Sequence, residues 1–437
     1  MKVFPIVIIL LFGFCLVTAQ QTENTKKVMD GFPPARESQV TLLNYREYPY
    51  NTWSFRNIGG PMHTLMLPRS GSIHQYKLSA QPAVAKVLIK DPEGSTKSFE
   101  DVFKENYTSG LIVLQNNTLL YENYWNGLTR DHHHVWYSMT KSMASIAFGI
   151  LVEQKKIDLS ASPSRYIPEL KNTPFDRATI QDVLNMSTAL DFKENYTDTS
   201  SFFWKYYGAA RGAYYTKGAR DADPMTTEIY GVYDFLAKSL KPNLNLKPGE
   251  VFEYNSPNAD VIGWMIARIS GLSTIEFIRE SIWAKIGAEH DASMTVDRAY
   301  MGVTTATMST TLRDATLFGK LVLDRGKLDR KQIVPYKWID EITAITPEDK
   351  LRYSKNEVYA KSDIPWVTYK NFWWILDEKK GELAAVGTNG QVIYINRSAN
   401  LVIAYFSCHP GASSAGNKNF KVKLSACREL SRQLAQK

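Results

Sequence analysis

Ser138 and Lys141, three residues apart, form the pair in this chain whose types and spacing could do chemistry. The apolar residues that follow, from Met143 to Leu151, recur at i, i+3, i+4, i+7 and i+8, the period of a helix with one buried face. Ser138 is therefore predicted to open a helix, with Lys141 one turn later on the same side. The N–H groups of a helix N-terminus favour developing negative charge, and a lysine in an apolar setting loses its proton more readily. The pair could supply a nucleophile and its base, although the same spacing also occurs by chance.

Strand patterns on both sides of a helical middle region predict the elements that must position this pair. Thr108 to Tyr124 alternates and carries an Asn-Asn turn, which is typical of a hairpin. Four strands are also predicted near the end of the chain: Asn371 to Leu376, Glu382 to Val386, Gln391 to Asn396 and Leu401 to Ser407. A last helix is predicted from about Asn419 to Gln436. The fold class is therefore α/β (α+β), an antiparallel sheet flanked by helices with a mainly helical inserted domain.

The chain divides into four predicted parts. Residues 1–19 are a signal peptide and 20–105 an irregular N-terminal wrap with a few strands; 106–159 with 295–437 form the sheet domain, and 160–294 the mainly helical domain. Asp191 to Asp223 is predicted to be a long aromatic connection. Its length exceeds that of a plain linker, so it is a candidate functional loop that shapes the pocket.

The composition is that of an ordinary globular protein, with 44% hydrophobic and 22% charged residues in 437. The net charge of +8 is spread along the chain without a dense basic block, which argues against nucleic acid as a partner. His132, His133 and His134 are adjacent and not spaced along one helical face, and there is no His-Glu-x-x-His. We therefore predict no metal and no organic cofactor. The expected partner is a small-molecule ester, amide or peptide substrate.

The N-terminus has the pattern of an export signal. Lys2 is followed by an apolar run from Val3 to Val17 and then by small residues up to Ala19. The run is shorter than the roughly 20 residues that a membrane span needs. We expect an exported chain, periplasmic or secreted, with no stable membrane span after cleavage; an uncleaved anchor is the alternative.

Two cysteines, Cys408 and Cys427, remain after the predicted cleavage. An even number in an exported protein permits one disulfide, which would tie the last helix to the sheet. Two independent buried thiols are the equal alternative.

Three segments, in this order, resemble the motifs of the serine β-lactamase and penicillin-binding-protein superfamily. The first is Ser138-Met-Thr-Lys141, and the second is the Tyr254-Asn-Ser256 element ahead of a helix. The third, Gly387-Thr-Asn-Gly-Gln391, opens a strand in the place of the family's Lys-Thr-Gly. The chain is most similar to class C-type members of the peptidase S12 kind, in the esterase and 6-aminohexanoate-dimer hydrolase branch. The resemblance implies a β-lactamase/transpeptidase-like fold.

The resemblance also implies a site. Ser138 is the expected nucleophile, Lys141 its base and Tyr254 the proton shuttle. The expected substrate-binding residues are Tyr196, Ser256, Asn389, Gly390 and Gln391. The backbone N–H of Ser138 and one near Gln391 are expected to form the oxyanion hole.

The third segment departs from the family pattern because it lacks the cation of Lys-Thr-Gly, which helps to bind the carboxylate of penicillin-type substrates. We therefore expect an exported esterase or amidase that forms an acyl-enzyme on Ser138. The alternatives are a D-aminopeptidase, D-Ala carboxypeptidase or β-lactamase acting on peptidoglycan-type substrates. An alternative of another class is a non-catalytic penicillin-binding or sensor protein.

Overall fold

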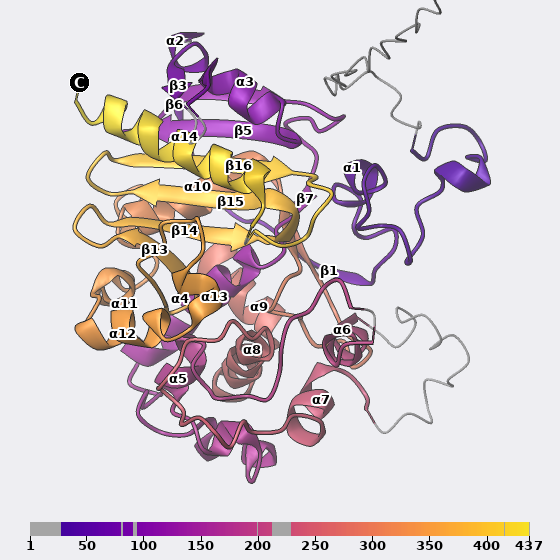
Figure 1. The fold of residues 1–437 in the computed structure, drawn as a ribbon, viewed down its shortest axis with the longest axis vertical. Helices are drawn as coiled ribbons and strands as arrows, with labels where there is room; N and C mark the ends of the chain where they lie inside the picture. The colour runs from indigo at the N-terminus through magenta and orange to yellow at the C-terminus, as the bar shows by residue number, and fades with distance from the viewer. Residues whose placement is uncertain are drawn as a thin grey trace, which may run out of the picture.

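An eight-stranded sheet is the centre of the fold (Figure 1). The computed structural model describes residues 28–79, 82–90, 94–198, 200–211, 229–414 and 416–436, so the predicted signal peptide lies outside the described residues. The strand order is β12 (Thr368–Lys370), β13 (Trp373–Asp377), β14 (Glu382–Gly387), β15 (Gln391–Asn396), β16 (Leu401–Ser407), β5 (Thr108–Gln115), β6 (Thr118–Tyr124) and β2 (Lys77–Leu78). All neighbours are antiparallel except β2 and β6.

Strands from both ends of the described chain meet in the middle of this sheet, where β16 pairs with β5 from Leu401 opposite Gln115 to Ser407 opposite Thr108. All seven residues of β16 are buried, because helices cover both faces of the sheet there. The predicted fold class, an antiparallel sheet flanked by helices, is therefore confirmed. The boundaries of the four predicted parts stay a prediction.

The nucleophile helix lies on one face of the sheet. This helix, α4 (Met139–Glu153), contacts β14 and β15, and α10 (Leu312–Leu323) contacts β15, β16 and β5. The C-terminal helix α14 (Lys418–Leu434) crosses the other face and packs against α3 (Phe99–Lys104) (Figure 1). Twelve of the fifteen residues of α4 are buried, so the helix that carries Lys141 is a core element with little exposed surface.

A smaller sheet and a group of helices complete the site region. The sheet has the order β1 (Thr64–Leu67), β8 (Ala292–Thr295), β9 (Met308–Thr310) and β7 (His134–Val135), and β7 leads directly to Ser138. The helices are α5 (Ile180–Leu184), α6 (Phe203–Arg211), α7 (Val232–Lys238), α8 (Pro257–Ser270), α9 (Thr274–Ile278) and the π-helical turn Arg279–Trp283. α8 packs along α4 and begins beside the second motif.

Shorter elements connect these layers. The short helices are α1 (Asn51–Ser54), α2 (Pro82–Ala85), α11 (Tyr336–Thr343), α12 (Pro347–Ser354) and α13 (Glu357–Ala360). The short strand pairs are β3 (Leu88–Lys90) with β4 (Thr96–Ser98), and β10 (Lys327–Leu328) with β11 (Lys331–Gln332). In the described part of the chain, no single helix has the length and apolar character to cross a membrane. α8 and the helical stretch Thr274–Trp283 reach these limits only as a pair bent by 81°.

The N-terminal wrap, in which a few strands were expected, and the aromatic connection both contain regular structure. The N-terminal wrap supplies β2 to the main sheet and β1 to the smaller one. The aromatic connection contains α6, and its residues 212–223 lie outside the described ones. The inward face of α6 carries buried residues at i, i+3, i+4 and i+7, namely Phe203, Tyr206, Tyr207 and Ala210. This is a helical period, so part of the connection that we expected to be a functional loop is a helix.

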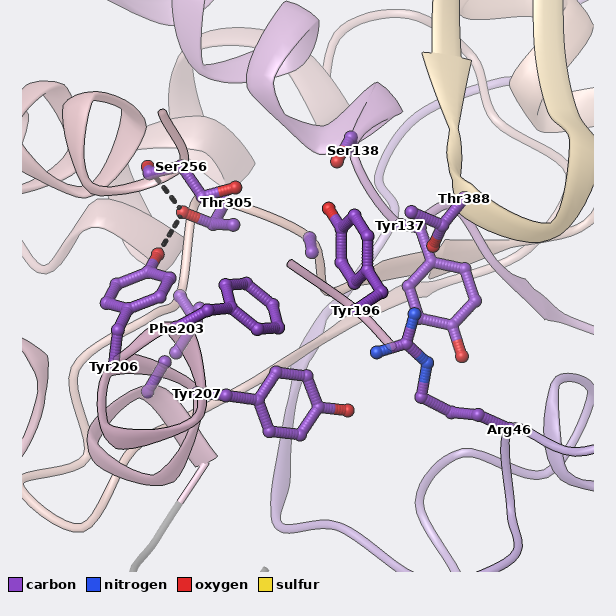
Figure 2. Close-up of a pocket in the computed structure, with 13 residues that line it drawn as sticks. Arg46, Tyr137, Ser138, Tyr196, Phe203, Tyr206, Tyr207, Ser256, Thr305 and Thr388 are labelled. Atoms are coloured by element: carbon purple, nitrogen blue, oxygen red, sulfur yellow. Dashed lines mark hydrogen bonds between the residues drawn. The ribbon is translucent and has the colours of Figure 1, made fainter. Parts of the chain in front are cut away.

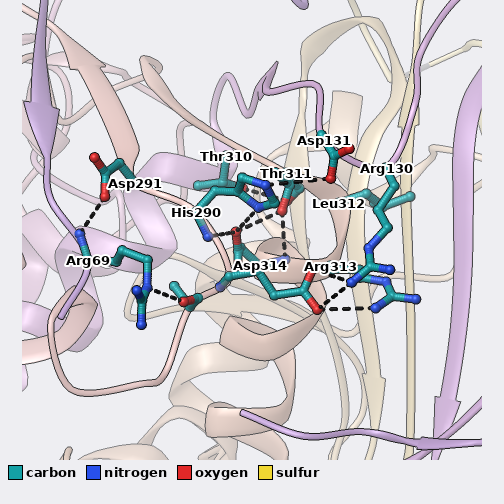
Figure 3. A network of polar contacts seen from close by, with 12 residues as sticks. Arg69, Arg130, Asp131, His290, Asp291, Thr310, Thr311, Leu312, Arg313 and Asp314 are labelled. Carbon is teal, nitrogen blue, oxygen red and sulfur yellow. Dashed lines mark hydrogen bonds and ion pairs between the residues drawn. The ribbon is translucent and has the colours of Figure 1, made fainter. Parts of the chain in front are cut away.

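A network of polar contacts fixes α10 against both sheets (Figure 3). Asp314 accepts a hydrogen bond from the backbone N–H of Glu289 at 2.7 Å and one from the Thr311 hydroxyl at 2.7 Å. Arg313 forms ion pairs with Glu289 at 3.1 Å and with Glu122 of β6 at 2.6 Å. Since Glu289 lies just ahead of β8, these bonds join the first turn of α10 to the smaller sheet and to the edge of the main sheet.

Cys408 and Cys427 are buried free thiols in this structure, which is the second of the two expected alternatives. The Cys408 thiol donates to the carbonyl oxygen of Tyr107 at 3.5 Å. The Lys423 side chain interacts electrostatically with both sulfurs. The two thiols therefore belong to a polar cluster between the buried face of α14 and the sheet.

Candidate active site

The chain turns sharply just before Ser138. Tyr137 has a φ of 47°, which is uncommon for an aromatic residue, and α4 begins at Met139 immediately after the serine. The Lys141 ammonium donates to Ser138 Oγ at 2.9 Å. Lys141 is fully buried and Ser138 is 9% exposed. The predicted helix therefore brings the serine and lysine into direct contact.

A second layer of polar contacts fixes Lys141. Its ammonium also donates to the carbonyl oxygen of Thr305 at 2.8 Å. Asp260 on α8 in turn accepts bonds from the Thr305 N–H at 3.1 Å and the Thr305 hydroxyl at 2.8 Å. Burial raises the pKa of the Asp260 carboxyl, while bonds from Tyr206 and Thr305 and the charge on Lys141 lower it in part. The backbone carbonyl of Thr305 thus helps to hold the lysine in place.

Tyr254 stands beside the pair. Lys141 Nζ lies 5.0 Å from the centre of the Tyr254 ring, and Trp374 of β13 stacks on the same ring at 5.7 Å. Burial, together with the negative charge of Glu194, raises the pKa of the Tyr254 phenol well above its usual value; a hydrogen bond from Ser138 lowers it only in part. Tyr254 is therefore a protonated phenol at neutral pH, which suits a proton donor.

Tyr196 is held by a carboxylate that also contacts the second motif. Its phenol donates to Glu194 at 2.5 Å, and the other oxygen of Glu194 accepts the backbone N–H of Ser256. Burial, with the charge of Glu194, raises the pKa of Tyr196 well above its usual value. Tyr196 and Ser256 line the same cavity as Ser138, and their predicted role in binding substrate stays a prediction.

The third segment contacts the serine turn through its first glycine. A Cβ at Gly387 would lie 2.2 Å from the carbonyl oxygen of Trp136, so only glycine lets the end of β14 approach this closely. Thr388, the next residue, lines the cavity. Its hydroxyl is buried and has no hydrogen-bond partner among the described residues.

The side chains of the other residues in this segment are used elsewhere. Asn389 donates to the carbonyl oxygen of His409 at 2.7 Å, and a Cβ at Gly390 would lie 2.6 Å from the His409 ring. Gln391 donates to the carbonyl of Ser407 at 2.8 Å and accepts the Ser407 N–H at 2.9 Å. None of the three lines the cavity around Ser138, and their contact with substrate stays a prediction. They shape the turn between β14 and β15, and Thr388 occupies the position facing the cavity.

The cavity beside Ser138 has a largely aromatic wall (Figure 2). It is lined by Arg46, Tyr137, Ser138, Tyr196, Phe203, Tyr206, Tyr207, Ala210, Ser256, Val303, Thr305, Ala306 and Thr388. An aromatic pocket with a few convergent polar groups is typical of a small-molecule site. The sequence predicted that the segment containing the α6 residues shapes the pocket, but it gave no such role to Arg46, Thr305 or Thr388, which carry no readable signal.

A family model described as Beta-lactamase matches residues 99–426 of this chain, about three quarters of it. The match includes all three motif segments and the helix that carries Lys141. It leaves out the N-terminal segment from which Arg46 reaches the cavity.

Individual proteins extend the likeness over nearly the whole chain. The 6-aminohexanoate-dimer hydrolase of Paenarthrobacter ureafaciens is 28% identical over 379 residues, which cover 87% of this chain and 91% of that protein. A solved structure described as "Putative 6-aminohexanoate-dimer hydrolase from Bacillus anthracis" is 26% identical, with a TM-score of 0.79 over 93% of this chain and 99% of the other.

A family VIII carboxylesterase shares the fold alone, at 14% identity and a TM-score of 0.55, over 82% of this chain and 100% of the other. The matched family, the buried serine–lysine pair and the similarity to 6-aminohexanoate-dimer hydrolase agree with one another. The chain therefore belongs to the β-lactamase family and is a serine hydrolase of the amidase or esterase kind.

Proposed function

We propose that this chain hydrolyses linear amides or esters related to the 6-aminohexanoate dimer, through an acyl-enzyme on Ser138. The observation that carries this proposal is the 2.9 Å bond between Lys141 Nζ and Ser138 Oγ at the edge of an aromatic cavity. The similarity to the Paenarthrobacter enzyme supports the substrate class, because it extends over 87% of the chain. The absent cation of the third motif disfavours penicillins as the main substrates.

In this mechanism Ser138 Oγ attacks the carbonyl carbon while Lys141, as the free amine, takes the hydroxyl proton. The Tyr254 phenol gives its proton to the leaving nitrogen or oxygen and regains one from Lys141. Water then cleaves the acyl-enzyme by the reverse transfers. No acceptor among the described residues is paired with the backbone N–H of Ser138 or of Thr388. We assign these two groups to the oxyanion, in place of one near Gln391.

Ser138→Ala tests the assignment. The variant should lose turnover of the 6-aminohexanoate dimer and of a p-nitrophenyl ester by at least about a thousandfold, since a nucleophile that acts as a unit with its base is lost. Intact-protein mass should record an acyl adduct on the wild type and none on the variant. Ser145→Ala is the matched control, because Ser145 lies on the same helix, fully buried, and has no hydrogen-bond partner among the described residues.

Acylation that persists in Ser138→Ala would contradict the assignment. A parallel panel of D-amino-acid peptides and a penicillin separates the proposed substrates from the peptidoglycan-type alternative. Faster turnover of the D-peptides than of the dimer would replace the proposed substrate class and leave the nucleophile unchanged.

We also propose that the chain is exported, since the apolar run from Val3 to Val17 ends in small residues at Ala19. N-terminal sequencing of the protein recovered outside the cytoplasm should begin at Gln20. Recovery of the chain in the cytoplasm with Lys2 intact would reject export.

A further inference from the structure

Arg46 brings a positive charge into the cavity from a part of the chain that lies outside the family match (Figure 2). It belongs to the N-terminal segment between the turn Arg36–Ser38 and α1, and its side chain lines the same cavity as Ser138. In Figure 2 its guanidinium points toward Tyr196 and Tyr137, which lie on the side of Ser138. The cavity thus contains a cation that comes from an element other than the third motif.

Three tyrosine rings hold the Arg46 side chain. The guanidinium carbon lies 5.4 Å from the ring centre of Tyr137, 5.7 Å from that of Tyr196 and 5.5 Å from that of Tyr207. Tyr207 is in turn hydrogen-bonded through its hydroxyl to that of Tyr45, next to Arg46 in the chain. Aromatic faces attract a guanidinium but accept none of its in-plane N–H bonds. These three rings, which we call the tyrosine cage, therefore orient the planar guanidinium. They leave its N–H groups available to donate hydrogen bonds to a ligand.

No anion balances this charge within the described residues. The Arg46 guanidinium there has neither a carboxylate within ion-pair distance nor a hydrogen-bond acceptor, whereas Arg313 has two carboxylates. A half-buried cation without an acceptor is costly, so such a site favours an anionic ligand that can supply paired oxygens. Thr388 adds a second donor to the same cavity, because its buried hydroxyl is also unpartnered among the described residues.

We propose that Arg46 binds a free carboxylate of the substrate, with the Thr388 hydroxyl as a second donor. The preferred substrates are then amides or esters that carry a carboxylate at a distance from the bond that is cleaved. This inference rests on the proposed function, since it uses the cavity of the Ser138 nucleophile. It deepens that function by naming Arg46 as a residue that determines substrate specificity. A planar guanidinium suits this role because it can donate two parallel hydrogen bonds to a carboxylate.

Binding to the inactive Ser138→Ala protein tests this independently of turnover. The two probes are 6-acetamidohexanoate, which has a carboxylate, and 6-acetamidohexanamide, its neutral equivalent, both titrated by calorimetry. The carboxylate should bind at least about tenfold more tightly, because a charge-assisted bond contributes about 1.5–3 kcal/mol. Adding Arg46→Gln should remove this preference and change the affinity for the neutral probe less than about twofold, whereas Arg46→Lys should keep part of it.

Arg36→Gln is the matched control, since it removes an exposed positive charge from the same segment. It should leave the preference unchanged. Thermal unfolding of each variant shows whether loss of the tyrosine cage contacts has altered the fold.

The proposal is overturned if the carboxylate has no advantage, if neither probe binds, or if Arg46→Gln weakens both probes equally. The last result would give Arg46 a purely structural role. Failure of Ser138 labelling rejects the proposed function, but the carboxylate preference and its loss in Arg46→Gln can still be measured. The two failures are therefore distinguishable.

Discussion

At the scale of single residues, the site depends on which protons its groups keep. Ser138 and Lys141 are joined by one hydrogen bond, and Tyr254 lies against the lysine with its phenol buried. Burial disfavours the phenolate of Tyr254 because it makes any charge costly, and the nearby negative charge of Glu194 repels it. In the resting enzyme Tyr254 is therefore protonated, and it can act as a proton donor.

This gives a pH prediction. Because the pKa of Tyr254 is raised above its ordinary value of 10.0, the protonated donor persists up to at least that pH. The pH profile of kcat/KM should contain no loss due to Tyr254 between neutral pH and about 10. Tyr254→Phe should lower kcat by about 10²–10⁴, the range of general acid–base catalysis. An alkaline decline below about pH 9 that disappears in Tyr254→Phe would contradict a raised pKa.

At the scale of elements, α4 must lie close to its neighbours if Lys141 is to reach Thr305. Gly149 in this helix meets the indole of Trp338 on α11, and a Cβ there would lie 2.2 Å from two of its ring atoms. Glycine is unfavourable within a helix by about 1 kcal/mol relative to alanine. The close approach of α4 and α11 explains why this residue is a glycine, because the indole of Trp338 packs directly against the backbone of α4 there.

Gly149→Ala should therefore destabilise the protein, although alanine is the better helix former. Overpacking costs about 1–3 kcal/mol and outweighs the gain in helix propensity where the neighbour is a rigid, buried indole. The measurement is the midpoint of urea unfolding. Ser145→Ala, on the same helix, should be neutral or slightly stabilising, since it removes a buried hydroxyl that lacks a partner in the described residues. Equal stability of Gly149→Ala and the wild type would contradict the packing argument.

At the scale of the whole molecule, the C-terminal helix closes the sheet through a buried lysine. Lys423 of α14 donates to the Ser407 hydroxyl at 2.6 Å and to that of Thr108 at 3.3 Å, and it lies 4.8 Å from the Tyr405 ring centre. Ser407 and Thr108 are paired across β16 and β5, where strands from the two ends of the described chain meet. Burial lowers the pKa of Lys423 to about 7.

Stability should therefore rise with pH above neutrality. Below pH 7 Lys423 is charged in both the folded and unfolded states, and the folded state carries the cost of the buried charge. Above pH 7 the folded lysine is neutral while the unfolded one, with its ordinary value of 10.5, still binds a proton. The free energy of unfolding then increases by up to about 1.4 kcal/mol per pH unit from this group.

Lys423→Met should remove this dependence, and it should stabilise the protein more at pH 6 than at pH 8.5. Urea unfolding at the two pH values measures the difference, and 8.5 stays below the ordinary value of 9.0 for the thiols of Cys408 and Cys427. Lys421→Met is the control, because Lys421 is partly exposed and paired with Asp363 at 3.1 Å. An equal effect of Lys423→Met at both pH values would show that the lysine does not change charge on folding.

The sequence by itself determined the features that depend on local order along the chain. The helical period after Ser138 placed Lys141 one turn away, and largely apolar runs separated by turn signals located β15 at Gln391–Asn396 and β16 at Leu401–Ser407. The three motif segments indicated the family and the serine hydrolase chemistry. Such features are readable because neighbours three or four apart on a helix, or two apart on a strand, share a face whatever surrounds them.

Only the tertiary structure decided which distant residues complete the site. Thr305 holds Lys141 through a backbone carbonyl, a group that every residue has and that no pattern can single out. Arg46 lies in an irregular segment without periodicity, 92 positions before Ser138, and the turn at Thr388 faces the cavity while Gln391 turns toward Ser407. These arrangements follow from how the layers pack, because burial and long-range hydrogen bonds depend on elements far apart in the chain.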